Sequence, residues 1–248
     1  AVTFAARCGY SHVGLRPVPA TSEEPHVPIL TDSAVQRELS ARLDGEGLFV
    51  LDMEIVRLRD VIDWSEMERV LAFAQKFGAR FLLVADNDPD PVRSRDSLAR
   101  LAELAASYNV IPHLEFMPWT CSPNLAAAQA RTIGIANCGM LIDAFHLARS
   151  GGFPEDLTPN DPAIGYLQLC DIAGPIPVLD EVLREARSDR LFPGEGEIDL
   201  ASIACALPSI PVSLEIPSDR LRDAGWSAEQ RARKAIETCR AVLEQAGG

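Results

Sequence analysis

Short apolar segments alternate with longer amphipathic segments along almost the whole chain, and this alternation restricts the fold more than any other feature. Most of the apolar segments are nearly continuous and end in a polar or charged residue; they are residues 11–16, 47–58, 80–86, 110–118, 139–146, 164–171 and 210–217. Such runs are typical of buried parallel strands. The segments with helical character are residues 33–43, 64–77, 95–108, 122–135, 178–186, 200–206 and 228–245. This order predicts an α/β fold with parallel strands and right-handed crossovers.

The length and the number of strands favour one (β/α)8 barrel. A chain of 248 residues suits one such barrel, and no linker or change in composition marks a boundary, so residues 1–248 are predicted to form a single domain. A closed barrel needs eight strands, whereas seven are found. The chain opens with residues 2–10, which resemble the end of a helix. We therefore expect the first strand to be missing at the N-terminus; the alternative is an open or irregular barrel.

The charge and the cysteines exclude several classes of protein. The chain carries 36 acidic and 23 basic side chains, for a net charge of −13, which opposes binding to nucleic acid or anionic lipid. It has no apolar run of about 18 residues and no secretory signal pattern, so no membrane span or export is expected. None of the six cysteines forms a C-x-x-C pair, which argues against zinc ribbons and thioredoxin-like sites. Reduced thiols in a cytoplasmic protein are the preferred interpretation.

Four strand ends carry side chains with an oxygen atom that faces the predicted barrel mouth. His113 and Glu115 share one strand face, and Asp143, Gln168 and Glu215 occupy the corresponding ends of three other strands. One such carboxylate is more often a cap or an ion-pair partner than a metal ligand. Three that converge would repel each other, and a divalent cation would resolve that repulsion. Oxygen ligands favour Mn²⁺ or Mg²⁺, with Zn²⁺ or Co²⁺ as alternatives.

Seven segments resemble, in order, those of the sugar phosphate isomerase/epimerase family. They are VGLR, LDMEIVRL, HLEFMP, LIDAFHLARSGG, YLQLCD, LFPGEGEIDL and VSLEIP, of which GEGEID at 194–199 is the most distinctive. The family consists of xylose isomerase-like TIM barrels and also includes ketose 3-epimerases and endonuclease IV. The resemblance therefore implies a xylose isomerase-like (β/α)8 TIM barrel for this chain.

The resemblance also implies a set of metal ligands. In the family a Glu, an Asp, a His and a final Glu bind the metal, and the matching residues here are Glu115, Asp143, Gln168 and Glu215. Glu115 and Glu215 would also be the catalytic acid/base pair. Gln168 departs from the family pattern, because an amide oxygen is a weaker ligand than an imidazole nitrogen. Alternatively, Gln168 only forms hydrogen bonds and the metal keeps an extra water.

Five further residues are candidates for substrate binding. The resemblance assigns this role to His146, three residues after Asp143, and to Arg190, just before LFPGEG. Arg16, Glu54 and His113 are weaker candidates. The alternatives are that His146 is an ordinary loop histidine and that Arg190 is an exposed loop arginine.

The activity implied is that of a metal-dependent isomerase or epimerase acting through an enediolate on a sugar, sugar phosphate or related polyhydroxy carbonyl compound. One alternative uses the same site as a dehydratase of the inosose or dehydroshikimate type, because loss of water β to a carbonyl begins with the same proton removal. A more distant alternative is a non-catalytic binding protein on a decayed site, since Gln168 replaces a ligand. Endonuclease IV is disfavoured, because its zinc cluster is rich in histidine and this acidic chain has four. Barrels of this kind often form homodimers, and a homodimer is a further expectation.

Overall fold

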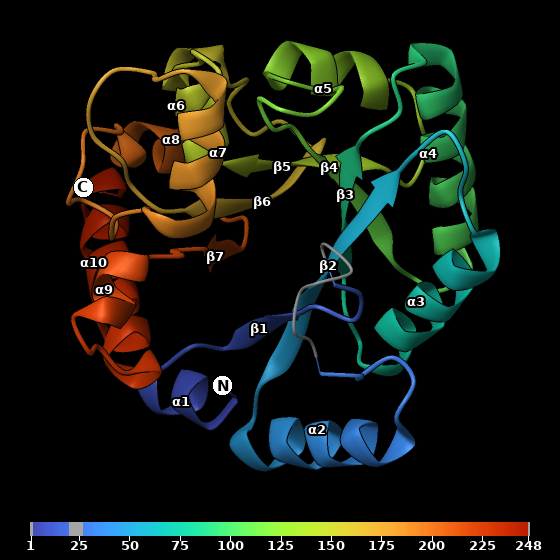
Figure 1. Cartoon of the computed structure of the whole chain (residues 1–248), viewed down its shortest axis with the longest axis horizontal. Helices are drawn as coiled ribbons and strands as arrows, with labels where there is room; N and C mark the ends of the chain where they lie inside the picture. Colours follow the sequence, from blue (N-terminus) through green and yellow to red (C-terminus); the bar gives the residue numbers. More distant parts are fainter. Residues whose placement is uncertain (1, 20–26, 248) are drawn as a thin grey trace. The chain divides into compact units, whose positions relative to one another are not determined.

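The computed structural model describes residues 2–19 and 27–247 (Figure 1). The chain folds as two compact units. The first comprises Ala1–Leu114 and Ala130–Gly139, and the second comprises Glu115–Gln129 and Met140–Gly248. In the part of the chain that the structure describes, no helix is both long enough and apolar enough to cross a bilayer.

The first unit is built on parallel strands. β1 (His12–Leu15) pairs with β2 (Phe49–Leu58), and β2 pairs with β3 (Phe81–Asp86), both in parallel. β4 (Ile111–Glu115) follows and delivers its last residue to the second unit. The helices are α1 (Val2–Cys8), α2 (Ser33–Glu46), α3 (Trp64–Lys76) and α4 (Pro91–Ala106). All six residues of β3 are buried, as expected for a strand covered on both faces.

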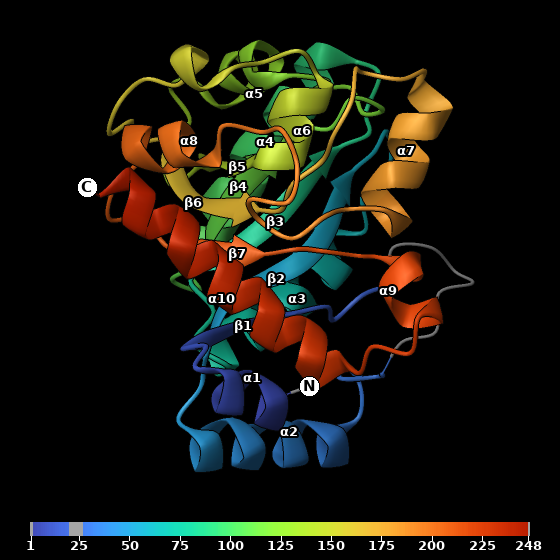
Figure 2. The same cartoon turned by 90° about the vertical axis from the view of Figure 1, so that its left-hand side faces the viewer.

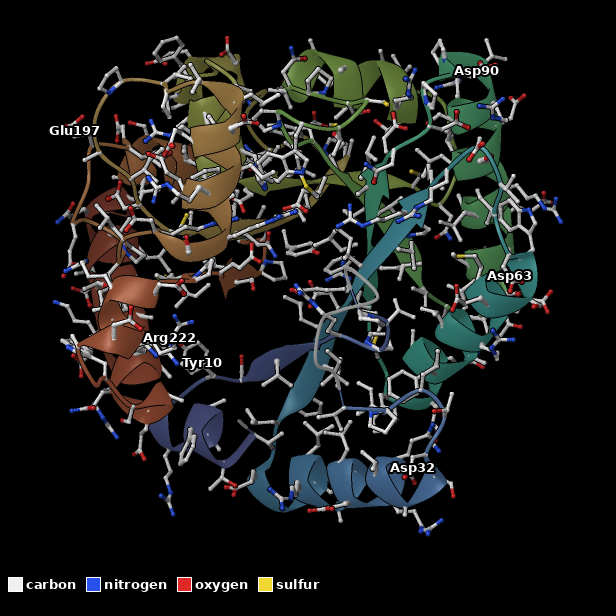
Figure 3. All side chains as sticks on the ribbon, in the orientation of Figure 1. Tyr10, Asp32, Asp63, Asp90, Glu197 and Arg222 are labelled. Atoms are coloured by element: carbon white, nitrogen blue, oxygen red, sulfur yellow. The ribbon has the colours of Figure 1, made fainter. Side chains whose placement is uncertain are left out.

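Aspartate side chains determine where three of these helices begin. Asp32, Asp63 and Asp90 directly precede α2, α3 and α4, and Figure 3 labels all three. In each case the carboxylate accepts hydrogen bonds from the backbone N–H groups two and three residues later. Those N–H groups have no partner inside the helix, so the cap stabilises its first turn by about 1 kcal/mol.

The second unit repeats the parallel pattern. β5 (Gly139–Asp143) pairs with β6 (Ile164–Leu169), which pairs with β7 (Val212–Leu214). Its helices are α6 (Ala144–Arg149), α7 (Leu179–Ser188), α8 (Leu200–Ala206), α9 (Asp219–Asp223) and α10 (Ala228–Ala246), with a short 3-10 helix at Pro154–Asp156. Figure 2 shows α10 running past α8. α5 (Leu125–Thr132) has residues in both units.

All seven predicted strands are present, and the helical character predicted for residues 2–10 is confirmed by α1. That a further strand precedes α1 stays a prediction, as does the single domain over residues 1–248. The strand predicted over 139–146 is wrong at its end, because β5 stops at Asp143 and α6 begins at once. The predicted loop at 150–162 contains the short 3-10 helix, and α9 was not predicted.

The buried carboxylate of Asp171 organises the loop that contains the distinctive GEGEID stretch. One oxygen, Oδ1, accepts hydrogen bonds from the backbone N–H groups of Ile172 at 2.9 Å and Ile198 at 3.1 Å. The other, Oδ2, accepts one from Gly194 at 2.9 Å. The side chain of Asp171 is fully buried, so these hydrogen bonds replace the hydration that its charge loses.

Both glycines of this stretch have a structural reason. Gly194 has φ +81, in the left-handed region that glycine adopts at no steric cost. A Cβ atom at Gly196 would collide with the backbone oxygen of Ile172 and with Oδ1 of Asp171. The two glycines of the motif therefore allow the backbone to pass close to the buried carboxylate of Asp171.

Replacing Gly196 by alanine should lower the free energy of unfolding by about 1–3 kcal/mol, because the new methyl group forces the loop away from Asp171. Gly45→Ala is the matched control, since that Cβ would lie in open space within α2 and should be neutral or stabilise by up to about 1 kcal/mol. Urea unfolding followed by circular dichroism measures both variants. A wild-type midpoint for Gly196→Ala would contradict the assignment.

Candidate metal centre

The ends of four strands deliver the candidate ligands to the second unit. Glu115 is the last residue of β4 and Asp143 is the last residue of β5. Gln168 lies directly opposite Asp143 on the neighbouring strand β6. Glu215 immediately follows β7, whose Ser213 pairs with Gln168. The parallel register therefore places the polar ends of β5, β6 and β7 at one edge of their sheet.

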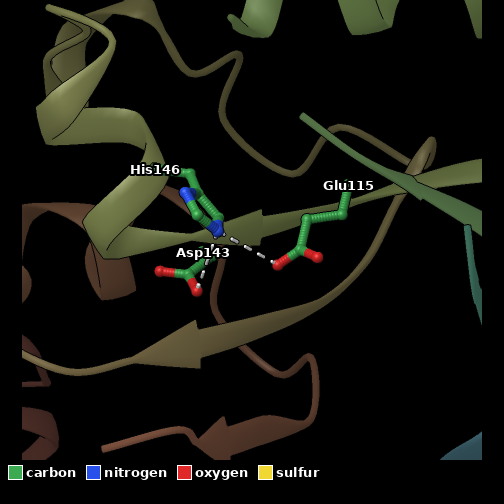
Figure 4. Close-up of side chains that lie close together, drawn as sticks. All are labelled: Glu115, Asp143 and His146. Carbon is green, nitrogen blue, oxygen red and sulfur yellow. Dashed lines mark ion pairs between the residues drawn. The ribbon is translucent and has the colours of Figure 1, made fainter. Parts of the chain in front are cut away.

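Glu115, Asp143 and His146 form a compact buried group (Figure 4). One ligand atom from each side chain can be chosen so that all lie within 4.8 Å of one another. Nε2 of His146 is 3.7 Å from Oε1 of Glu115 and 3.8 Å from Oδ2 of Asp143. Two ligands that share one ion at about 2.1 Å are roughly 3.0–4.2 Å apart. The spacing therefore fits a single divalent cation.

His146 is held in the neutral state that metal binding requires. It lies in α6, so the interpretation as a loop histidine is wrong. Burial lowers the pKa of His146 well below its usual value, and the positive charge of Arg190 acts in the same direction while Glu215 opposes it. Trp119 and Phe145 pack edge-on against the imidazole, at 5.1 and 5.3 Å between ring centroids. A neutral imidazole keeps a free lone pair for a metal.

Arg190 is a buried member of this site, so the interpretation as an exposed loop arginine is wrong. Its side chain is only 3% exposed. Nη1 donates to Oδ2 of Asp143 at 2.7 Å and lies 3.2 Å from Oε2 of Glu215. Its backbone N–H donates to the carbonyl of Pro217, which holds the residue against the segment after β7.

The formal charges of the site leave room for one divalent cation. Glu115, Asp143 and Glu215 contribute three negative charges, Arg190 contributes one positive charge, and neutral His146 contributes none. The sum is −2. A divalent ion would bring the formal sum over these five residues to zero. The donor set, with carboxylates, an imidazole and an amide, also suits such an ion.

The side chain of Gln168 is buried, and the described residues supply no hydrogen bond to it. The residue is 1% exposed, and neither Oε1 nor Nε2 has a partner within residues 2–19 and 27–247. An unsatisfied buried amide costs about 1–3 kcal/mol. A metal bound to Oε1 would relieve part of this cost, which supports Gln168 as a ligand.

Three predicted substrate-binding residues belong to the first unit. His113 packs edge-on against Phe81 at 4.5 Å, and its Nδ1 lies 3.1 Å from the backbone oxygen of Ile111. Burial lowers the pKa of His113 to about 4. Arg16 donates to Oε2 of Glu54 at 3.2 Å. A substrate-binding role for His113, Arg16 and Glu54 stays a prediction.

Two residues of the site were missed by the sequence argument. Sγ of Cys170 lies 3.7 Å from Nη1 of Arg190, and burial raises the pKa of this thiol, which therefore stays protonated. The signal for Cys170 was its position two residues after Gln168 on the same strand face. Trp119, against His146, follows the strand in a turn, where no periodicity marks it.

Comparisons with known proteins give a family and several relatives. The sequence profile of the family described as xylose isomerase-like TIM barrel matches residues 2–242. A 3-dehydroshikimate dehydratase from Pseudomonas aeruginosa is 29% identical over 190 residues, or 71% of this chain and 28% of that protein. An inosose isomerase from Bacillus licheniformis is 28% identical over 158 residues, or 61% of this chain and 55% of that protein. The chain thus spans about a quarter to a half of these relatives.

A solved structure shows the same fold. The crystal structure of the IolI protein with a bound zinc atom has a TM-score of 0.80 and 19% identity, and the match covers 99% of this chain and 92% of that one. The predicted fold class is therefore confirmed.

Replacing Gln168 by histidine should tighten Mn²⁺ binding by about tenfold or more, because imidazole is the stronger neutral ligand. Isothermal titration of metal-free protein with Mn²⁺ measures the change. Gln168→Leu is the control, since it keeps the approximate size but removes the oxygen and should weaken binding. Equal affinities in all three proteins would remove Gln168 from the ligand set.

Proposed function

Because the chain belongs to the xylose isomerase-like TIM barrel family, we propose that it is a metal-dependent isomerase or epimerase of a sugar, sugar phosphate or related polyhydroxy carbonyl compound. The observation that carries this proposal is the buried group of Glu115, Asp143 and His146, which has ligand-like spacing and, with Glu215 and Arg190, a net formal charge of −2.

The carboxylates of Glu115, Asp143 and Glu215 are the proposed anionic ligands of the ion. Oε1 of Gln168 and Nε2 of His146 are the neutral donors at the same site. Mn²⁺ and Mg²⁺ are favoured because most of the donors are oxygen atoms. The zinc atom in the related IolI structure keeps Zn²⁺ as an alternative.

The chemistry proposed is proton removal from the carbon beside a carbonyl group. When bound, the ion polarises the carbonyl and stabilises the negative charge that develops on its oxygen. The side chain of Glu215 is 34% exposed, so its carboxylate is accessible to a small molecule and suits the base that removes the proton. Arg190 orients this carboxylate through the 3.2 Å contact with Oε2. Glu115 is the proposed second member of the acid/base pair, and Trp119 and Phe145 shield His146 from water.

A dehydratase on the same site is the second candidate. The match to a 3-dehydroshikimate dehydratase over 71% of this chain favours it. Elimination of water β to a carbonyl needs the same base and the same polarised carbonyl, followed by protonation of the leaving hydroxyl. The two candidates therefore differ in what happens after proton removal.

Glu215→Gln should reduce kcat by about 10²–10⁴-fold and weaken metal binding, because an amide neither removes the proton nor supplies a negative charge. The fold should be unchanged by circular dichroism. Glu195→Gln is the control, since this glutamate is similarly exposed and forms an ion pair with Lys234. Wild-type turnover in Glu215→Gln would refute its role.

A panel of ketoses and cyclic polyhydroxy ketones in D₂O separates the two reactions. Deuterium uptake by NMR without loss of water is expected for the isomerase or epimerase. Formation of an enone that absorbs in the ultraviolet would establish the dehydratase instead. If the protein binds neither Mn²⁺ nor Mg²⁺ at millimolar concentration and converts nothing, it is a non-catalytic protein.

A further inference from the structure

We propose that Arg190 is a built-in counter-cation that competes with the metal ion for Asp143 and Glu215. This inference rests on the proposed function and goes further: the same side chain that holds Asp143 and Glu215 together also limits their affinity for metal. Arg190 is then a positioning residue whose partners are protein carboxylates, in contrast to the substrate-contacting role that the sequence suggested.

The contacts of Arg190 are those of a small cation. One atom, Nη1, lies 2.7 Å from Oδ2 of Asp143, 3.2 Å from Oε2 of Glu215, 3.4 Å from the backbone oxygen of Glu215 and 3.7 Å from Sγ of Cys170. These acceptors come from the ends of β5, β6 and β7. A single nitrogen thus gathers groups from three strand ends, as a metal ion would.

Two other arginines each pair with a single carboxylate through two nitrogens. Nε and Nη2 of Arg149 donate hydrogen bonds to the two oxygens of Glu185. The same two nitrogens of Arg93 donate to the two oxygens of Asp88, so both pairs are bidentate. Bidentate pairing is the usual strong geometry between guanidinium and carboxylate. Arg190 instead divides one nitrogen, Nη1, between the carboxylates of Asp143 and Glu215.

Arg190 is also fixed in place. Its Nε donates to the backbone oxygen of Ala186 at 3.0 Å, and the guanidinium stacks 4.7 Å from the ring centroid of Phe145. Because the group is buried, water does little to screen its charge. The positive charge therefore repels a cation that approaches Asp143 more strongly than an exposed arginine would.

The proposed competition between Arg190 and the metal ion takes place at one oxygen of Asp143. Oδ1 of Asp143 caps α6 by accepting the N–H of Phe145 at 2.7 Å, so only Oδ2 is directed at the site. That same Oδ2 accepts from Nη1 of Arg190 and lies 3.8 Å from Nε2 of His146. A metal ion bound to Oδ2 must share the oxygen with Nη1 or displace it.

The test compares Mn²⁺ binding and thermal stability in metal-free wild type and Arg190→Gln. The variant should bind Mn²⁺ at least about tenfold more tightly, because a repelling charge is removed and Oδ2 is released. Its metal-free form should melt at a lower temperature, and saturating Mn²⁺ should raise its melting temperature more than it raises that of wild type. Arg149→Gln is the matched control, a buried arginine of the same unit; it should also melt earlier but keep the wild-type Kd.

A measurement on the wild-type protein covers the case in which Arg190→Gln does not fold. NMR of protein labelled with ¹⁵N-arginine should show the guanidinium signal of Arg190 shifting during a Mg²⁺ titration, while that of Arg149 stays in place. Wild-type binding with an unchanged or weaker Kd in Arg190→Gln, or no shift of the Arg190 signal at saturating Mg²⁺, would overturn the inference and leave the proposed function standing. Absence of metal binding in both proteins would overturn the two together.

Discussion

The carboxylate of Asp143 is the group on which the second unit depends. Oδ1 accepts the N–H of Phe145 at the point where β5 ends and α6 begins, and Oδ2 accepts a hydrogen bond from Nη1 of Arg190. The hydrogen bond from Phe145 places His146 one helical turn above the carboxylate. The hydrogen bond from Arg190 fixes the segment that follows α7. A fully buried carboxylate must have both oxygens satisfied. That requirement couples the local turn to the assembly of the candidate site.

The buried carboxylate of Asp171, just after β6, likewise has both oxygens satisfied by hydrogen bonds. This carboxylate accepts hydrogen bonds from three backbone N–H groups, and those of Gly194 and Ile198 tie the loop over 191–198 to this charge. The antiparallel bridge between Asp171 and Leu191 sets the neighbouring Arg190 in position. Two buried aspartates at successive strand ends thus build the surroundings of the proposed metal ion, one as a proposed ligand and the other as an organiser of the loop.

The proposed chemistry fits the diversity of the relatives. A 3-dehydroshikimate dehydratase and an inosose isomerase both match this chain at 28–29% identity. Removal of a proton beside a polarised carbonyl is a first step that both kinds of reaction can share. Because the shared step needs the buried carboxylates and the ion, the scaffold can stay constant while the groups around the substrate change. We propose that Gln168 and Arg190 are positions at which this chain tunes such a site.

Apolar runs that end in a polar residue are local signals, so the sequence alone predicts the seven strands and the placing of Glu115, Asp143, Gln168 and Glu215 at strand ends. The caps at Asp63 and Asp90 are local signals as well, but they were not predicted. The end of β5 was missed, although the Phe145 N–H that donates to Oδ1 of Asp143 makes a local cap of the same kind. The burial of Arg190, the lack of a hydrogen-bond partner for Gln168 among the described residues and the position of His146 between two carboxylates emerge only in the folded structure. Those properties depend on residues distant in the chain, and no pattern of neighbouring residues encodes them.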